Sequence, residues 1–193
     1  MNEILYALME LISKESLRFQ FCHEQGFDTS CGLTVVATVL DHYWGVPVSE
    51  YELIEKIIAE KLAADDYSVS LSDLSEAFRI YGLSSKAFKM DWDALALMVQ
   101  KGYSPLIVHY DKPEKHFGLI LGFNGDTVIT LDPARGIESL SRQTFMSRYS
   151  GSAMLVASQS KKPDAAKIKK AIDWSEGRRL ALEQEAERFM GKW

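Results

Sequence analysis

Apolar positions recur at helical spacing in the first half of the chain and in short β-rich runs in the second half. From Cys31 to Tyr43 they return every three or four residues, which predicts a helix capped at its start by Asp28 or Ser30. Gly45 ends this helix. The same spacing, bounded by polar caps or glycines, predicts three more helices, over residues 49–62, 70–82 and 91–102.

The second half of the chain has the pattern of strands separated by turns. Apolar, β-branched and aromatic residues form runs at residues 105–110, 116–123, 126–132 and 152–158, with a short strand candidate at 83–90 and a short helix at 141–149. The pair Asn124-Gly125 lies between two of these runs and predicts a tight hairpin. Helices followed by strands predict an α+β fold, in which N-terminal helices pack on a C-terminal antiparallel β-sheet.

The two ends of the chain differ from its middle. Residues 1–18 are interrupted by acidic residues and predict an amphipathic helix, with Leu5, Leu8 and Ile12 on one face. Residues 161–193 are highly charged and carry a thin apolar stripe, made of Ile168, Ile172, Leu182, Ala186 and Phe189. This stripe predicts a C-terminal helical extension that packs on the body or on a partner protein, or else a solvated tail. The main domain is expected over residues 19–160.

Composition restricts the classes of function. With 193 residues, of which 47% are hydrophobic, the chain has the size of one domain. A net charge of −5 and a pI near 5.4 argue against nucleic acid or an anionic membrane as the main partner. No apolar run is long enough for a transmembrane helix. The start of the chain lacks the features of a signal peptide, so we expect a cytoplasmic protein, or a periplasmic or secreted one if a signal has been removed.

The two cysteines differ in their surroundings. Cys22 and Cys31 do not form a disulfide framework, and no Cys/His spacing resembles a zinc site, so we expect neither a metal nor a cofactor. Cys31 stands at the start of a predicted helix, where the dipole favours a thiolate. Gly32 beside it leaves room for an approaching substrate. On its own, this setting is also that of an ordinary buried cysteine.

A nucleophilic cysteine needs a base, and the chain offers four histidines. His42 lies about three helical turns beyond Cys31, too far to reach the thiol. His23 has no evident role, and His109 stands inside a strand and is the alternative base. His116 begins the strand after a turn, at the end of the sheet where an imidazole can meet a helix N-terminus.

The hairpin brings a carboxylate to His116. Asp132 ends the strand that follows the Asn-Gly turn, and antiparallel strands place the start of one beside the end of the other. Asp132 can therefore orient the imidazole, although an aspartate before proline is also a common turn residue. Gln25, just upstream of Cys31, can donate its amide N–H to an oxyanion, although it can equally be an exposed loop residue. Together these residues form one coherent site.

These motifs resemble the bacteriocin-processing, double-glycine leader cysteine peptidases of the papain-like superfamily. The resemblance covers about residues 19–157. Its elements are Gln25 six residues before Cys31-Gly32, the sequence HYWG at 42–45, His116-Phe117 and, sixteen residues after His116, Asp132-Pro133 with Gly136. Ser30 departs from the pattern, since the family has an aspartate before the nucleophile. Members often precede the membrane domain and ATPase of peptide exporters, and here a charged tail follows instead.

The resemblance implies a papain-like cysteine peptidase that hydrolyses a peptide bond through a thioester, after Gly-Gly in a leader-like segment. It implies Cys31 as nucleophile, His116 as base and then acid, Asp132 as its orienting partner and Gln25 as oxyanion donor. Gly32 and Phe117, next to the two reacting residues, are the candidate substrate-binding residues. Two alternatives stay open: a non-cleaving peptide-binding module of the same fold, as an accessory to secretion or export, and another Cys-His-Asp acyl transfer, such as transglutamination or amide hydrolysis.

Overall fold

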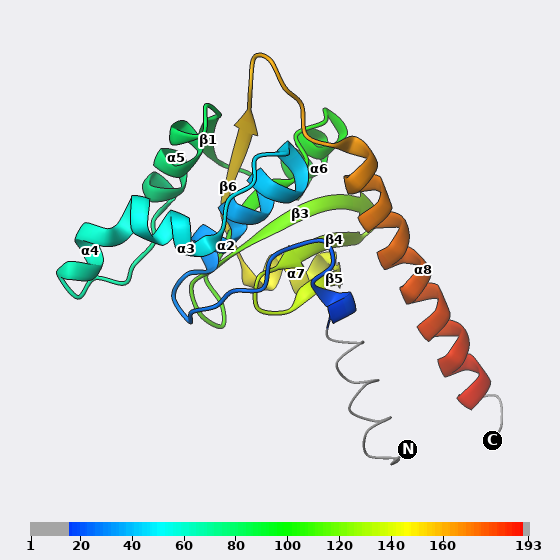
Figure 1. Cartoon of the computed structure of the whole chain (residues 1–193). Coiled ribbons are helices and arrows are strands. Elements are labelled where there is room, and N and C mark those ends of the chain that lie inside the picture. The colour runs from blue at the N-terminus through cyan, green and yellow to red at the C-terminus, as the bar shows by residue number, and fades with distance from the viewer. Residues whose placement is uncertain (1–15, 191–193) are drawn as a thin grey trace, which may run out of the picture.

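The apolar runs of the second half form a six-stranded sheet, in which every neighbouring pair of strands is antiparallel. The computed structural model describes residues 16–190. The order of the strands is β1-β6-β2-β3-β4-β5, so the early strand β1 joins the sheet at one edge, beside the last strand (Figure 1). The strands are β1 Ser84–Lys89, β2 Leu106–Tyr110, β3 His116–Asn124, β4 Thr127–Asp132, β5 Gly136–Ser141 and β6 Tyr149–Ala157.

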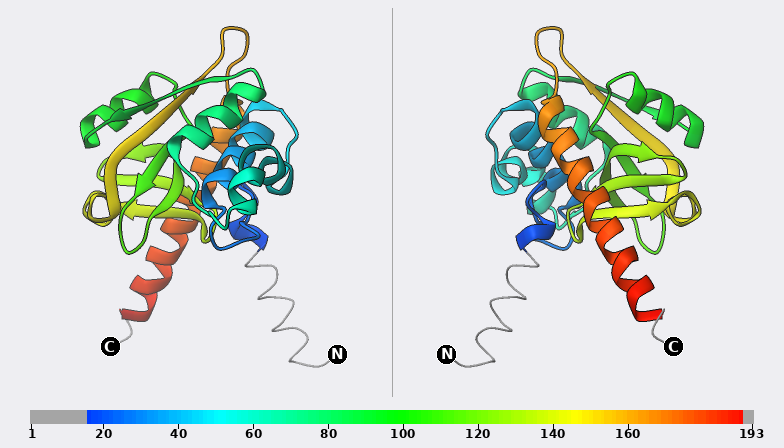
Figure 2. Two further views of the ribbon diagram at one scale, coloured as in Figure 1. Left: turned by 90° about the vertical axis from the view of Figure 1, so that its left-hand side faces the viewer. Right: turned by 90° about the vertical axis from the view of Figure 1, so that its right-hand side faces the viewer.

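Helices cover both faces of this sheet, as the two side views show (Figure 2). They are α2 Cys31–Thr38, α3 Glu50–Leu53, α4 Ala59–Ala63, α5 Leu71–Ile80, α6 Trp92–Gln100, α7 Arg142–Arg148 and α8 Ala165–Met190, with π-helical turns η1 Val39–Tyr43 and η2 Ile54–Ile58. The predicted α+β fold, with N-terminal helices on an antiparallel sheet, is confirmed.

Alternate side chains of the central strand β3 enter two different cores. Leu119 and Leu121 pack with α2, α5 and α8 on one face of the sheet, whereas Ile120 packs with α6 and α7 on the other. A strand that is buried on both faces has no polar alternation, which explains the continuous apolar run in the sequence. The first core packs α2 against β3, and the candidate site lies at the start of this strand.

Most of the predicted helix boundaries are confirmed. The side chains of Ser49, Ser70 and Asp91 each accept a hydrogen bond from a main-chain N–H in the first turn that follows. Helices α5 and α6 are followed by Gly82 and Gly102, which both have positive φ. Gly125, in the β3–β4 hairpin, has a φ of 59°, as a tight Asn-Gly turn requires.

Three elements differ from the prediction, and one of them is the helix over residues 49–62, which the π turn η2 interrupts. Strand β5 follows the Asp132 turn and was not predicted, because its sequence, GIESLS, alternates poorly and it lies at an edge of the sheet. The helix from Cys31 widens into a π turn after Thr38. Ser30 does stand at the cap position, but its hydroxyl donates to Glu50 and to the carbonyl of Phe27 instead of accepting from the helix.

The predicted N-terminal helix with Leu5, Leu8 and Ile12 lies outside the described residues. Helix α8 does form, and its two halves differ: Ile168 and Ala171 are buried, whereas Leu182 is 57% exposed. In Figure 1 the red end of α8 extends beyond the sheet. The side chain of Phe189 lies outside the description. Within residues 16–190, no helix combines the length and apolar character needed to cross a bilayer.

Candidate active site

Cys31 is the first residue of α2 and is 8% exposed. The helix starts here because residues 26–30 form an irregular loop, while the apolar residues from Leu33 onward pack against the sheet. The first N–H groups of any α-helix have no partner within the helix. The sulfur therefore lies beside main-chain donors that can stabilise negative charge.

The hairpin joins His116 and Asp132 as its geometry predicts. His116 begins β3 opposite Tyr110, and Asp132 ends β4 opposite Gly136. The Nε2 atom of His116 lies 3.0 Å from Oδ1 of Asp132. The same oxygen accepts the main-chain N–H of Ala134 at 2.8 Å, so the carboxylate is held in the turn and aimed at the imidazole.

The electrostatics favour a protonated His116. Burial lowers the pKa of this imidazole, but hydrogen bonds and charge interactions with Asp132 and with Cys31 outweigh burial and raise the pKa from 6.5 to about 9. Because Nε2 faces Asp132, the other ring nitrogen, Nδ1, is the one left for Cys31. For Asp132, burial raises the pKa, and the His116 and Ala134 hydrogen bonds and the charge of Arg135 together bring it below its ordinary value.

Gln25 is tied to the same turn by its main chain. Its N–H donates to the carbonyl of Pro133 at 2.9 Å, and its side chain lines a hollow with His116 and Asp132. The Oε1 atom of Gln25 is buried and has no hydrogen-bond partner among residues 16–190. The structure thus brings the side chain of Gln25 to the hollow that holds the imidazole.

His116 and Cys31 each line one of two hollows. The one on the His116 side has a volume of about 100 Å³, and the one on the Cys31 side about 310 Å³. Asp28, Glu114 and Lys115 line both, so the hollows adjoin. The wall of the larger hollow also includes Thr29, Cys31, Tyr67, Ser68, Val69, His109 and Phe117.

Phe117 and Gly32, the candidate substrate-binding residues, differ in their surroundings. Phe117 is 5% exposed and forms part of the larger hollow. Gly32 is buried, and a Cβ there would come within 2.8 Å of Val69 Cγ1 and 3.1 Å of Phe117 Cδ2. Core packing therefore requires this glycine, which is a different physical reason from the open substrate path expected from the sequence.

His109, the alternative base, lines the larger hollow and lies edge-on to Phe117, with ring centroids 5.0 Å apart. Its Nδ1 is 3.6 Å from Oδ1 of Asp111, which is beyond hydrogen-bond distance. Burial lowers its pKa, and the opposite pull of Asp111 does not offset this effect. The oriented imidazole is therefore that of His116.

Sequence patterns did not reveal two residues that position the site. Tyr110 is buried and stacks on His116, with ring centroids 6.3 Å apart and planes inclined by 17°. Glu50, at the start of α3, accepts hydrogen bonds from the Gly26 N–H at 2.9 Å, the Thr34 hydroxyl at 2.7 Å and the Ser30 hydroxyl. One carboxylate thus holds both ends of the loop between Gln25 and α2. A lone acidic residue at a helix start gives no sequence signal for such a contact.

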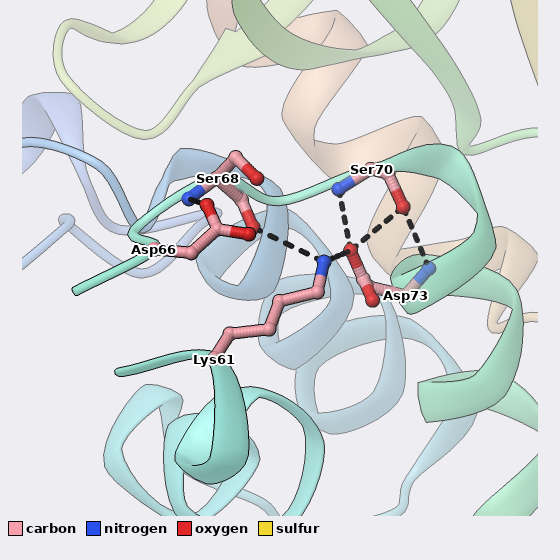
Figure 3. Close-up of polar contacts among 5 residues, drawn as sticks. All are labelled: Lys61, Asp66, Ser68, Ser70 and Asp73. Atoms are coloured by element: carbon pink, nitrogen blue, oxygen red, sulfur yellow. Dashed lines mark hydrogen bonds and ion pairs between the residues drawn. The ribbon is translucent and has the colours of Figure 1, made fainter. Parts of the chain in front are cut away.

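A second polar network holds the far wall of the larger hollow. Lys61 lies between the carbonyl of Ser68 and the carboxylate of Asp73, with its Nζ 2.6 Å from Oδ2 of Asp73 (Figure 3). Asp73 also accepts the N–H of Ser70, and Asp66 accepts that of Ser68. The segment with Tyr67 is therefore fixed to α4 and α5.

Cys22 has the properties of an inert thiol. It is 4% exposed, and burial together with the charges of Asp132 and Glu24 raises its pKa to about 12. Both cysteines are free.

Comparisons with known proteins show the family of this chain. A model of the peptidase C39 family matches residues 21–161. The probable functional amyloid protease FapD of Pseudomonas aeruginosa is 26% identical over 148 residues, covering 74% of this chain and 62% of that protein. FapD of Pseudomonas fluorescens is 28% identical over 137 residues, covering 69% and 59%. The chain thus spans about three fifths of these relatives.

Two solved structures share the fold. The peptidase domain of Streptococcus ComA, a bifunctional ABC transporter involved in quorum sensing, has a TM-score of 0.60 at 23% identity, over 72% of this chain and 98% of that one. A double glycine motif protease from an AMS/PCAT transporter, in complex with the leader peptide, has a TM-score of 0.59 at 21% identity, over 74% and 91%.

The family match and the shared fold thus place this chain in the class of cysteine peptidase domains. Within that class, the chain belongs to the peptidase C39 family.

Proposed function

We propose that this chain hydrolyses a peptide bond with Cys31 as nucleophile and His116 as general acid and base. The single observation that carries the proposal is the 3.0 Å contact between His116 Nε2 and Asp132 Oδ1, which holds the imidazole at the hollow that adjoins the one lined by Cys31. A permanently oriented imidazolium beside a thiol favours the thiolate form needed for attack. Degenerate sites that only bind peptides do not need this arrangement.

The proposed reaction has two steps. The Cys31 sulfur attacks the carbonyl carbon of the scissile bond, and His116 gives its Nδ1 proton to the leaving amine as the C–N bond breaks. A thioester remains on Cys31. Water then attacks the thioester, His116 takes a proton from this water, and the carboxylic acid product leaves the sulfur. Asp132 stays ionised and keeps the imidazole oriented throughout.

The oxyanion is stabilised by the main-chain N–H of Cys31 and by the side-chain amide of Gln25. The main chain of Gln25 is hydrogen-bonded to the turn that follows Asp132. This bond fixes the main chain from which the Gln25 side chain extends, beside the imidazole. Removal of one such donor typically lowers the rate by about 10²–10³-fold. The same reduction is expected for Gln25→Ala.

The substrate is a peptide or protein segment that is cleaved after Gly-Gly. The hollow on the His116 side, of about 100 Å³, suits residues with little or no side chain, whereas the larger hollow with Phe117 and Val69 accepts an apolar side chain. The leader peptide bound to the double glycine motif protease of similar fold supports this class of substrate. The FapD relatives suggest that an amyloid-forming protein is one kind of target.

A peptide-library digest tests the proposal. Wild type and Cys22→Ala should yield the same fragments, and Cys31→Ala and His116→Ala should lower cleavage by about 10³-fold or more. Peptides with Gly-Gly before the cleaved bond should be preferred. Retention of peptides without any cleavage by the wild type would instead favour the binding module. Transfer of the acyl group to added amines would favour another Cys-His-Asp acyl transfer.

A further inference from the structure

A second cluster of side chains with possible chemistry lies on the other end of the nucleophile helix. His23 precedes the loop of the active site, and Asp41 and His42 belong to the π turn η1. One potential ligand atom from each residue lies within 4.8 Å of the other two. His23 Nε2 is 3.0 Å from Oδ2 of Asp41, and the two imidazole rings are 4.8 Å apart at an angle of 83°.

The backbone holds this cluster in place independently of the contacts within it. The N–H of His23 donates to the Thr38 hydroxyl at 3.0 Å, and the Tyr43 hydroxyl donates to the carbonyl of Phe21 at 2.9 Å. The segment that carries His23 is therefore bonded on both sides of the π turn. Such turns are rare and occur frequently at functional sites.

We propose that His23, Asp41 and His42 bind a divalent transition-metal ion of the zinc type. Two imidazole nitrogens and one carboxylate oxygen are a donor set that suits Zn²⁺ and its neighbours, whereas Mg²⁺ and Ca²⁺ prefer oxygen ligands alone. Tetrahedral zinc needs ligand atoms about 3.3 Å apart, so the closest pair is already suitably spaced and the widest pair must approach by roughly 1.5 Å. Side-chain rotation at the partly exposed histidines provides this movement.

The charges around the cluster favour coordination over simple attraction of a cation. The positive charge of Lys167 acts on the imidazole of His42. Lys167 on α8 repels cations in general. An ion must therefore gain enough from the imidazole bonds to overcome this repulsion, which selects zinc-type ions over Mg²⁺.

The position of the cluster gives the ion a structural effect. It would join the segment before Gln25 to the helix that begins at Cys31, so binding would raise the stability of the folded chain. The sequence could not predict this site, because His23 lies eighteen residues from Asp41 in the chain and the spacing matches no metal motif. The expectation of no metal, made from that spacing, is replaced here by this proposal.

The experiment titrates Zn²⁺ into the full chain carrying Cys31→Ala, which removes the thiol that could bind zinc together with His116. Calorimetry should give one ion per chain, and the thermal midpoint should rise with Zn²⁺ and not with Mg²⁺. Co²⁺ should give the visible absorption of a nitrogen- and oxygen-ligated ion. Adding His23→Asn, His42→Asn or Asp41→Asn should weaken binding by roughly 10–100-fold or more.

The matched control is His109→Asn in the same Cys31→Ala background, because it removes a partly buried histidine outside the cluster. It should bind Zn²⁺ as its parent does. Absence of binding by the parent would overturn the proposal. So would equal affinity in the parent and in both variants His23→Asn and His42→Asn. Neither result would bear on peptide cleavage, which depends on other residues.

Discussion

One carboxylate oxygen of Asp132 makes two structural contacts. It accepts the N–H of Ala134 within an aspartate-proline turn and also faces Nε2 of His116. The two interpretations of this residue in the sequence, a turn residue and an orienting residue, are therefore compatible. The local hydrogen bond from Ala134 already fixes the orientation of the Asp132 carboxylate. The carboxylate therefore loses no further orientational freedom when it pairs with the imidazole.

The pH dependence of catalysis should report this pair. A protonated His116 is needed for the thiolate–imidazolium state, so kcat/KM should fall as the pH rises through about 9. Asp132→Asn removes a charge that raises the pKa of His116, and the alkaline fall should move about one pH unit or more lower. Asp111→Asn, which changes an exposed carboxylate beside His109, should leave the alkaline fall of kcat/KM at the same pH as in the wild type.

Stability should follow the same titration. The pKa of His116 is raised in the folded chain, from 6.5 to about 9. The stabilisation from this charged pair is therefore complete below pH 6.5 and is lost as the pH rises through about 9. Denaturant unfolding of wild type and His116→Ala at pH 6 and pH 10 measures this stabilisation. The difference in unfolding free energy between the two proteins should shrink at pH 10, and an unchanged difference would contradict the assignment.

At the scale of elements, the sequence predicted those features that depend on interactions between nearby residues. Helix caps such as Ser70 and Asp91 and the Asn-Gly hairpin depend on residues within a few positions, and these predictions are confirmed. The hairpin also placed His116 beside Asp132. Edge strand β5 and the loop before Cys31 depend on distant partners, so no local pattern indicated them.

Glu50 is the clearest of these distant partners. It holds Gly26, Ser30 and Thr34, and its loss would leave three donors without their acceptor on the loop that spans Gln25 to the nucleophile. Ser30, which stands where the resemblance predicts an aspartate, donates its hydroxyl to this carboxylate.

We expect Glu50→Ala to lower kcat by about tenfold or more with little change in KM, because loss of this anchor misplaces the reacting groups more than the substrate site. The unfolding free energy should fall by about 2 kcal/mol, the value for a hydrogen-bonded charged group. Glu50→Gln, which keeps part of the hydrogen bonding, should recover part of kcat. Glu60→Ala, at an exposed position of α4, is the control. A loss of stability without any change in kcat would make Glu50 structural only.

For the whole molecule, the sheet is an intermediate layer between two cores, and the site lies at one end of it. Helix α8 completes the core on the side of the nucleophile helix. Trp174 packs edge-on against Phe21 with ring centroids 5.8 Å apart, and Ile172 lies over Gly122, where a Cβ would come within 2.7 Å of its Cδ1. The Asp164 N–H donates to the Tyr43 carbonyl at 2.7 Å. The first half of the charged extension is therefore part of the fold.

The two halves of α8 should then respond differently to the same kind of substitution. Ile168 is 9% exposed within the core, and Ile168→Ala should lower the unfolding free energy by about 2–4 kcal/mol. Leu182 is 57% exposed, and Leu182→Ala should change it by less than about 0.5 kcal/mol. Denaturant titration of both variants measures the difference. Because alanine is the best helix former, neither substitution weakens α8 through its propensity. Equal and small effects would therefore mean that α8 does not pack on the body in solution.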